Sequence, residues 1–282
     1  MHPITILPIP ALLREIPDAP QKLYIRGTYP DTTYTFLSVV GSRTYTPYGK
    51  RVCELLIAGL RGYPIVIISG LALGIDGIAH HAALAAGLRT IAVPGSGLDD
   101  SVLYPATHRV LAQKILECGG ALLSEFEPTW RPRPESFPQR NRIMAGLSHA
   151  VLVIEAEERS GTLITSRLAT EYNRDVFAVP GPIESATSKG PHMLIRKGAS
   201  LIAQSEDILE ALGIEPRTEG QQQLQFDLSP EERDITALLT TPLPRDELIR
   251  LSGKSTTEAN MLLSSLELKG VIDERMGRVC LM

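Results

Sequence analysis

Small and hydroxyl-bearing residues follow an apolar segment of the chain at a position where a phosphate could bind. Residues 153–171 run from a hydrophobic strand pattern through a charged turn into Ser160-Gly161-Thr162 and then into a helical pattern. Glycine lets backbone NH groups approach a ligand closely, and a helix N-terminus adds partial positive charge. The turn therefore predicts a phosphate cradle, although the three spaced glycines of a dinucleotide-binding loop are missing.

Four other apolar segments end in turns of the same kind. In an open parallel sheet, ligands bind beyond the carboxyl ends of the strands, so we expect all five turns to converge there. Glycine in a single turn is equally explained by the turn itself, and the prediction therefore depends on their number. The five turns are Gly41-Ser42-Arg43, Ser69-Gly70-Leu71-Ala72, Pro94-Gly95-Ser96-Gly97, Ser160-Gly161-Thr162 and Pro180-Gly181-Pro182.

A segment with the sequence FPQRNRIMAGLS, residues 137–148, adds an arginine and an aromatic ring. Arg140 precedes the buried stripe of Ile143, Met144 and Leu147 at helical spacing, so it should lie near the crevice. A guanidinium there suits bidentate contact with a phosphate. The alternative is an internal salt bridge to Glu125 or Glu155. Phe137 is either a stacking surface for an unpaired base or a core residue.

The elements that position these residues alternate between strands and helices. Six uniformly apolar segments predict strands that are buried on both faces, as in a parallel sheet covered by helices. A helix is expected from about Ile75 to Ala86, with an apolar stripe that packs on the sheet. The pattern predicts a doubly wound α/β fold with a mostly parallel sheet. The strand segments are 35–40, 65–68, 90–93, 121–123, 150–154 and 176–179.

Composition restricts the possible classes of protein. The apolar segments are too short to span a bilayer, and the N-terminus lacks the features of a secretory signal, so a cytoplasmic protein is expected. Three widely spaced cysteines indicate neither a disulfide framework nor a metal motif, and we expect no metal and no cofactor. A net charge of −4 argues against a surface that wraps duplex DNA.

Taken together, the motifs resemble the DprA/Smf family in order and over residues 20–212. They are VVGSRTYTPYG (39–49), ISGLALGIDGIAHHAAL (68–84), LLSEF (122–126), FPQRNRIMAGLS, SGTLITSRLATE (160–171) and VFAVPGPIESATSKGPHMLIRKGASLI (176–202). The resemblance implies an extended Rossmann fold that dimerises, binds and protects incoming single-stranded DNA in natural transformation, and helps to load the RecA recombinase. It implies no catalytic residues.

The resemblance also assigns site residues. Those implied for DNA binding are Ser42, Arg43, Ser69, Gly70, Phe137, Arg140, Asn141, Arg142, Ser160, Gly161 and Thr162. His192, Met193 and Ile195 lie in the segment that it assigns to dimer and RecA contacts, and ordinary core packing is the alternative. Two features depart from the family: His192 stands where many members have asparagine, and the helical SAM-like domain that begins many members is missing.

Four regions are expected along the chain. They are an N-terminal extension (1–30), the Rossmann-like domain (31–212), a polar linker (213–226) and a winged-helix domain (227–282). The last has a Ser229 cap, three helical patterns and a terminal hairpin around Met276-Gly277. From Asp227 onward there are ten acidic and seven basic residues. Because phosphate contact requires positive charge, we favour a protein-contact or accessory role over duplex reading.

The strongest alternative function is a nucleotide N-glycosidase of the phosphoribohydrolase type. That class resembles this fold and uses a PGGxGTxxE motif, which Ser160-Gly161-Thr162 matches only in its GT core. No glutamate follows at the required spacing, since Ser166 stands four residues after Thr162. The sequence therefore gives no carboxylate placed to act as a general base. Release of free base from a nucleoside monophosphate would favour the alternative.

Overall fold

Contacts along the chain divide it into two units, Met1–Pro216 and Arg217–Met282. The structure is a computed structural model that describes residues 2–215, 229–239, 243–269, 271–275 and 277–281. The linker expected over 213–226 lies outside the described residues from 216 onward. Each unit is described by itself.

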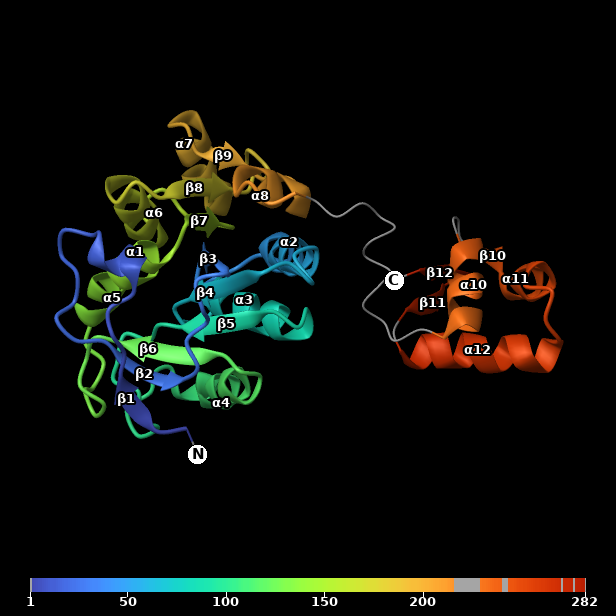
Figure 1. The fold of residues 1–282 in the computed structure, drawn as a ribbon. Helices are drawn as coiled ribbons and strands as arrows, with labels where there is room; N and C mark the ends of the chain where they lie inside the picture. The colour runs from blue at the N-terminus through green and yellow to red at the C-terminus, as the bar shows by residue number, and fades with distance from the viewer. Residues whose placement is uncertain (1, 216–228, 240–242, 270, 276, 282) are drawn as a thin grey trace. The chain divides into compact units, whose positions relative to one another are not determined.

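The first unit contains a nine-stranded sheet in the order β1-β2-β6-β5-β4-β3-β7-β8-β9 (Figure 1). The seven strands from β6 through β5, β4, β3, β7 and β8 to β9 are parallel to their neighbours. At the β6 side of the sheet, β2 pairs antiparallel with β6, and β1 pairs antiparallel with β2. The strands are β1 (Ile4–Ile6), β2 (Tyr24–Gly27), β3 (Thr35–Val40), β4 (Ile65–Ser69), β5 (Arg89–Ala92), β6 (Ala121–Ser124), β7 (Ala150–Val153), β8 (Asp175–Ala178) and β9 (Ser200–Leu201).

Helices cover both faces of this sheet. Side chains alternate along β3, so that Leu37 and Val39 pack on one face and Phe36 and Val40 on the other. The first face is covered by α2 (Pro47–Ala58), α3 (Ile75–Ala85), α4 (Arg109–Glu117) and α8 (Ser205–Ala211). The second is covered by α1 (Ala11–Arg14), α5 (Ser136–Leu147) and α6 (Thr162–Glu171). The remaining helical segments are η1 (Ala106–His108), η2 (Ala186–Ser188) and α7 (Lys189–Arg196).

The predicted doubly wound, mostly parallel fold is confirmed, and each of the six predicted strand segments forms a strand. Residues 1–30, which the sequence analysis sets apart as an extension, contribute β1, α1 and β2 to the unit. The strand order reverses at β3, which has β4 on one side and β7 on the other. Such a reversal opens a crevice at the carboxyl ends of the two strands, because their following helices cover opposite faces.

The second unit has the expected three helices and a small sheet. Its helices are α10 (Pro230–Leu238), α11 (Arg245–Leu251) and α12 (Thr256–Leu268), and its antiparallel sheet is formed by β10 (Leu243–Pro244), β12 (Arg278–Leu281) and β11 (Ile272–Arg275). Ser229 caps α10 as predicted, since its side chain accepts a hydrogen bond from the Glu232 backbone NH. Met276 of the predicted hairpin turn lies outside the described residues.

A buried carboxylate connects the start of α10 to the end of α12 in this unit. Glu232 of α10 is 3% exposed and accepts hydrogen bonds from the Lys269 ammonium at 2.8 and 2.7 Å and from the Ser265 hydroxyl at 2.7 Å. Hydrogen bonds from Lys269 and Ser265, with a further one from the Ser229 backbone, lower the pKa of Glu232 to about 2. The carboxylate therefore stabilises the folded unit only while it is ionised.

We expect the second unit to lose stability as the pH falls from 4.5, the ordinary glutamate value, towards about 2. The unfolded chain takes up the Glu232 proton at a higher pH than the folded unit does. Glu232→Gln removes the charge and is expected to lower the free energy of unfolding at pH 7 by about 1–3 kcal/mol. Urea unfolding of the full chain between pH 7 and pH 3 tests this, and an equally steep pH dependence in the variant would contradict it.

Candidate nucleic-acid interface

A cavity of about 660 Å³ opens at the carboxyl ends of β3 and β7, where the strand order reverses. Four parts of the chain line it: the loop after β3, the turn after β4 with the start of α3, the first turns of α5, and the loop between β7 and α6 together with the start of α6. Eight of the eleven residues predicted for DNA binding are among the lining residues: Ser42, Arg43, Phe137, Arg140, Asn141, Ser160, Gly161 and Thr162.

Arg43 and Phe137 form a pair at this cavity. The Arg43 side chain is exposed, and its guanidinium carbon lies 5.3 Å from the centroid of the half-buried Phe137 ring. Tyr104 supports the same ring, at 5.6 Å between centroids and with a tilt of 53°. A guanidinium over an aromatic face is favourable. The pair therefore presents a cation and a ring to the same ligand.

Arg140 lies at the inner wall of the cavity. It is 4% exposed, and its Nη1 donates a hydrogen bond to the carbonyl oxygen of Val93. Its guanidinium packs against Gly70, where an added Cβ would overlap it. Burial lowers the pKa of Arg140 to about 10, and the neighbouring Asp76 opposes that shift. Arg140 is therefore charged at neutral pH.

Asp76 is a cavity residue that the sequence analysis did not assign to the site. Its carboxylate accepts a hydrogen bond from the Gly70 backbone NH at 3.1 Å, and the side chain lines the cavity. Burial raises its pKa, while Arg140 and backbone NH groups oppose the shift. The predicted alternative partners of Arg140, Glu125 and Glu155, are wrong, because the acid beside its guanidinium is Asp76.

Five hydroxyls line the cavity, and the three that were predicted for DNA binding differ in what they offer a ligand. Ser42 donates its proton to the Thr44 carbonyl oxygen at 2.7 Å, and Thr162 donates its proton to that of Gly41 at 3.0 Å. Ser160 instead accepts a hydrogen bond from the Thr162 backbone NH at 3.2 Å. Its own proton has no acceptor among the described residues. Of these three hydroxyls, Ser160 is therefore the one that can donate to a phosphate.

Three predicted DNA-binding residues do not line the cavity. Ser69 is fully buried and donates its hydroxyl proton to the Val39 carbonyl oxygen at 2.7 Å. Gly70 is buried behind the Arg140 guanidinium. Arg142 points away and binds the Glu125 carboxylate and the Asp18 carbonyl oxygen. Direct DNA contact by these three is not supported, because their polar groups are used within the fold.

The five turns do not all meet at the cavity. The turns at Gly41 and Ser160 line it, and Ala72 contributes from the second turn. Gly95 of the third turn packs instead against the Phe137 ring, and Gly181 of the last packs against Ser188. The prediction of five converging turns is therefore wrong for two of them. Glycine in those two is required by close packing.

The cavity also contains two carboxylates. Asp76 and Glu157 line it together with Arg43 and Arg140, so the formal charges of the lining residues cancel when all four groups are ionised. Neither is the glutamate that the glycosidase motif would place after Thr162, because both precede Ser160 in the chain. Within the described ranges, no group of three or more His, Cys, Asp and Glu side chains could hold a metal ion.

The residues predicted for dimer and RecA contacts lie on α7, outside the cavity lining. His192, Met193 and Ile195 are half-buried, and His192 Nε2 lies 3.0 Å from the Gly181 carbonyl oxygen. Leu194 between them packs into the core on the α5 and α6 side of the sheet. The helix therefore has one side in the core and another that is partly accessible.

Comparison with known proteins identifies the family of the chain. The sequence profile described as DNA recombination-mediator protein A matches residues 7–213. The chain belongs to the DNA recombination-mediator protein A family. A second profile, the DprA winged helix domain, matches residues 219–278. The resemblance drawn from the motifs is thus confirmed.

No helix in the described part of the chain has the length and apolar character needed to cross a membrane.

Members of the family are similar in sequence and in structure. Protein Smf of Escherichia coli is 41% identical over 90% of this chain and 66% of its own length, and DNA processing protein DprA of Streptococcus pneumoniae is 46% identical over 70% and 68%. The chain thus spans about two thirds of the length of these curated relatives. The solved structure of the Streptococcus pneumoniae protein has a TM-score of 0.68 at 42% identity and 74% coverage of both chains.

A second solved structure is also similar to the chain. DNA processing protein A from Helicobacter pylori is 32% identical, with a TM-score of 0.66 and coverage of 75% of this chain and 96% of that chain. Its structure is described as giving insight into the single-stranded DNA binding mode of that protein.

Proposed function

We propose that the chain binds single-stranded DNA in the cavity at the ends of β3 and β7. The observation that carries the proposal is the Arg43 and Phe137 pair, with a guanidinium 5.3 Å from a ring centroid at the cavity. Unpaired nucleic acid offers both a phosphate for a cation and a flat base for a ring. Membership of the family, and the DNA binding of its Helicobacter pylori member, support the same function.

The contacts assign a different role to each group. Asp76 accepts a hydrogen bond from the Gly70 backbone NH, and the charges of Arg140 and Arg43 both act on it. Arg43 is exposed, whereas Arg140 is buried and donates to the Val93 carbonyl oxygen. Arg43 therefore meets a phosphate first, and Ser160 donates its hydroxyl proton beside it. Arg140 adds positive charge from the inner wall. Phe137 supports a base, and Asn141, one helical turn further along α5, faces the same cavity.

Single strands are favoured because of where the ring lies. A base stacks on Phe137 only when its own face is free, which is true of an unpaired strand and not of the interior of a duplex. Two arginines opposed by two carboxylates also give a weaker positive field than proteins that wrap duplex require.

The wider role follows from the family. We infer that the chain is a binding protein of the cytoplasm that protects incoming single strands in natural transformation and helps to load RecA. Dimer and RecA contacts are assigned to the accessible side of α7, through His192, Met193 and Ile195. In the second unit, Glu258 and Glu267 lie exposed on α12. That helix is therefore assigned to protein contact and not to duplex reading.

Salt dependence tests the proposal. Each phosphate of a single strand that the protein neutralises releases about 0.7 of a counterion. If the two cavity arginines each neutralise one phosphate, log affinity plotted against log salt has a slope of about −1.4. A short oligothymidylate and a filter or mobility assay at several salt concentrations measure that slope. A slope near zero, or failure to bind at low salt, would count against a phosphate site.

A further inference from the structure

A segment with a tryptophan, a phenylalanine, two arginines and two glutamates lies next to the cavity. We call Phe126–Glu135, between β6 and α5, the strap. It contains Trp130, the one tryptophan of the chain, whose side chain is 37% exposed. The Arg133 guanidinium carbon lies 5.0 Å from the Trp130 ring centroid, and Phe126 stacks with the same ring at 5.7 Å. Arg131 and Arg133 are both exposed.

The strap is held in place by its backbone. The Gly97 NH donates to the Trp130 carbonyl oxygen at 2.9 Å, and the Asp99 NH donates to that of Pro128 at 2.9 Å. Gly97 also approaches the Pro128 carbonyl so closely that an added Cβ would overlap it. The position of Trp130 is therefore set by the loop of residues 96–101.

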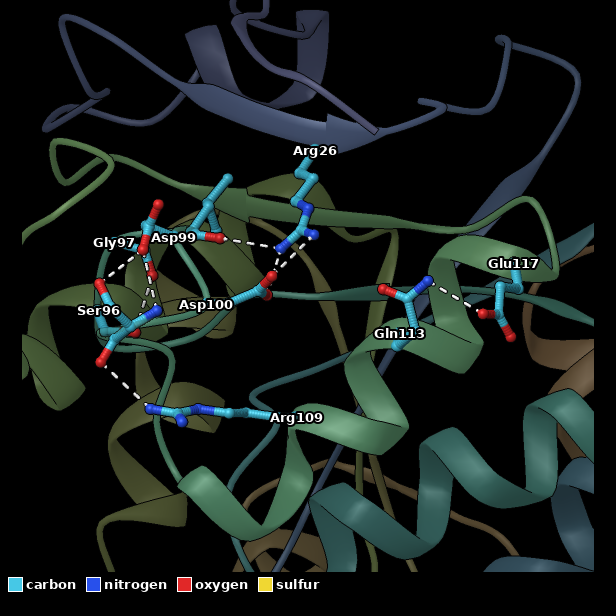
Figure 2. A network of polar contacts seen from close by, with 10 residues as sticks. Arg26, Ser96, Gly97, Asp99, Asp100, Arg109, Gln113 and Glu117 are labelled. Atoms are coloured by element: carbon cyan, nitrogen blue, oxygen red, sulfur yellow. Dashed lines mark hydrogen bonds and ion pairs between the residues drawn. The ribbon is translucent and has the colours of Figure 1, made fainter. Parts of the chain in front are cut away.

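That loop is in turn fixed to the sheet by Arg26. Figure 2 shows Arg26 reaching from β2 onto the loop, where its guanidinium binds both carboxylate oxygens of Asp100, at 2.5 and 3.2 Å. Its Nη1 also lies 3.4 Å from the Leu98 carbonyl oxygen. The Ser124 hydroxyl of β6 donates to the Ser96 carbonyl oxygen at 2.7 Å. An exposed tryptophan on so firmly braced a segment loses little conformational freedom when it binds a ligand.

The same loop connects the strap to the cavity. Gly95 packs against the Phe137 ring, whereas Gly97 binds the backbone of Trp130. These two glycines are two residues apart, so their Cα atoms lie within about 7 Å of each other. Pro134 of the strap itself lines the cavity. The strap is therefore continuous with the wall of the cavity.

The strap repeats the arrangement seen in the cavity. Arg43 over Phe137, at 5.3 Å, has a counterpart in Arg133 over Trp130, at 5.0 Å. In each pair a flat cation covers an aromatic face that a base could cover instead, after which the cation is free to contact the adjoining phosphate. Phe137 and Trp130 contact the same short loop, at Gly95 and at Gly97, and two pairs placed in this way suit nucleotides of one strand.

We propose that the strap is a second nucleotide subsite, in which Trp130 stacks on a base and Arg131 and Arg133 contact the phosphates of a single strand leaving the cavity. The inference rests on the proposed function and adds the direction in which the strand continues. It also gives longer strands a steeper salt dependence than short ones, because four arginines instead of two then contact phosphates, with a slope of about −2.8.

Tryptophan fluorescence tests the subsite in the unmodified chain. Because Trp130 is the one tryptophan, its emission reports this position alone. Oligothymidylates of about three and about twelve residues are the probes, the longer one being within the range that single-strand sites cover. We expect the longer probe to quench the emission and the shorter one to bind without quenching. Binding of the longer probe with unchanged emission would overturn the inference.

Variants separate the strap from the cavity. Trp130→Ala is expected to weaken binding of the longer probe by roughly 5- to 100-fold and to leave the shorter one unchanged, whereas Trp130→Phe retains most of the affinity. Arg133→Gln is expected to make the salt slope of the longer probe shallower by about 0.7. Arg61→Gln is the matched charge control, because Arg61 is exposed and precedes β4, at the amino ends of the strands, whereas the cavity lies at their carboxyl ends.

The cavity variant Arg43→Ala distinguishes the two proposals, since it should weaken both probes. Loss of binding by Arg43→Ala together with wild-type affinity of Trp130→Ala for the longer probe would overturn the strap subsite and leave the proposed function standing. Failure of the unmodified chain to bind either probe would overturn both.

Discussion

Arg140→Met is expected to lower the free energy of unfolding by about 3 kcal/mol, because it leaves the buried Asp76 carboxylate beside an apolar side chain. Methionine retains the apolar stem but not the guanidinium, which packs against Gly70, so the loss combines the charge with this packing. Asp76 and Arg140 are 7% and 4% exposed, so little water can compensate. Urea unfolding measures the change, and the variant is also expected to bind single-stranded DNA more weakly than the unmodified chain.

The double variant Asp76→Asn with Arg140→Met is the control for this result. If the two side chains stabilise each other, the double variant should recover part of the stability that the single variant loses. A double variant that loses the sum of the two separate effects would show that they act independently. In that case Asp76 would not be the counter-charge of Arg140.

Arg43→Ala is expected to weaken single-strand binding by about 1–3 kcal/mol, the usual loss for a charged hydrogen-bond partner, without a change in stability. Arg43 is exposed and its one described contact is with the Phe137 ring. A mobility or filter assay gives the affinity, and thermal unfolding gives the stability. Arg61→Ala is the control, since that arginine is equally exposed and remote from the cavity. Equal affinities in the two variants would contradict the assignment of Arg43.

The buried strand segments were readable from the sequence, but their order in the sheet and its antiparallel edge were not. Strands β3 to β8 are apolar on both faces, and this pattern is distinctive. By contrast, β2 has only four residues and includes Arg26, whose charge makes sense only with Asp100 opposite it, 74 positions along the chain. A short strand with a long-range ion pair has no local pattern, so its existence depends on the tertiary fold.

The candidate site shows the same limit. The turn of Ser160-Gly161-Thr162 and the leading position of Arg140 on α5 were predicted, and both line the cavity. Arg142 was assigned to DNA by resemblance, yet two helical positions turn a side chain by about 200°, which places it on the other side of α5. Ser69 ends a strand that is buried along its whole length. Asp76 was not predicted, because nothing local shows that α3 begins beside Arg140.

The central claim is that the chain binds single-stranded DNA in preference to duplex DNA. Competition between the two forms of DNA measures this preference most directly. A labelled oligothymidylate bound to the full chain is challenged with unlabelled single-stranded or double-stranded DNA of equal length at the same salt concentration, and the experiment is repeated with Arg43→Ala. The account predicts that single strands displace the label at much lower concentration than duplex and that Arg43→Ala weakens the binding of single strands. Equal displacement by both forms, unaffected by the loss of Arg43, would contradict it.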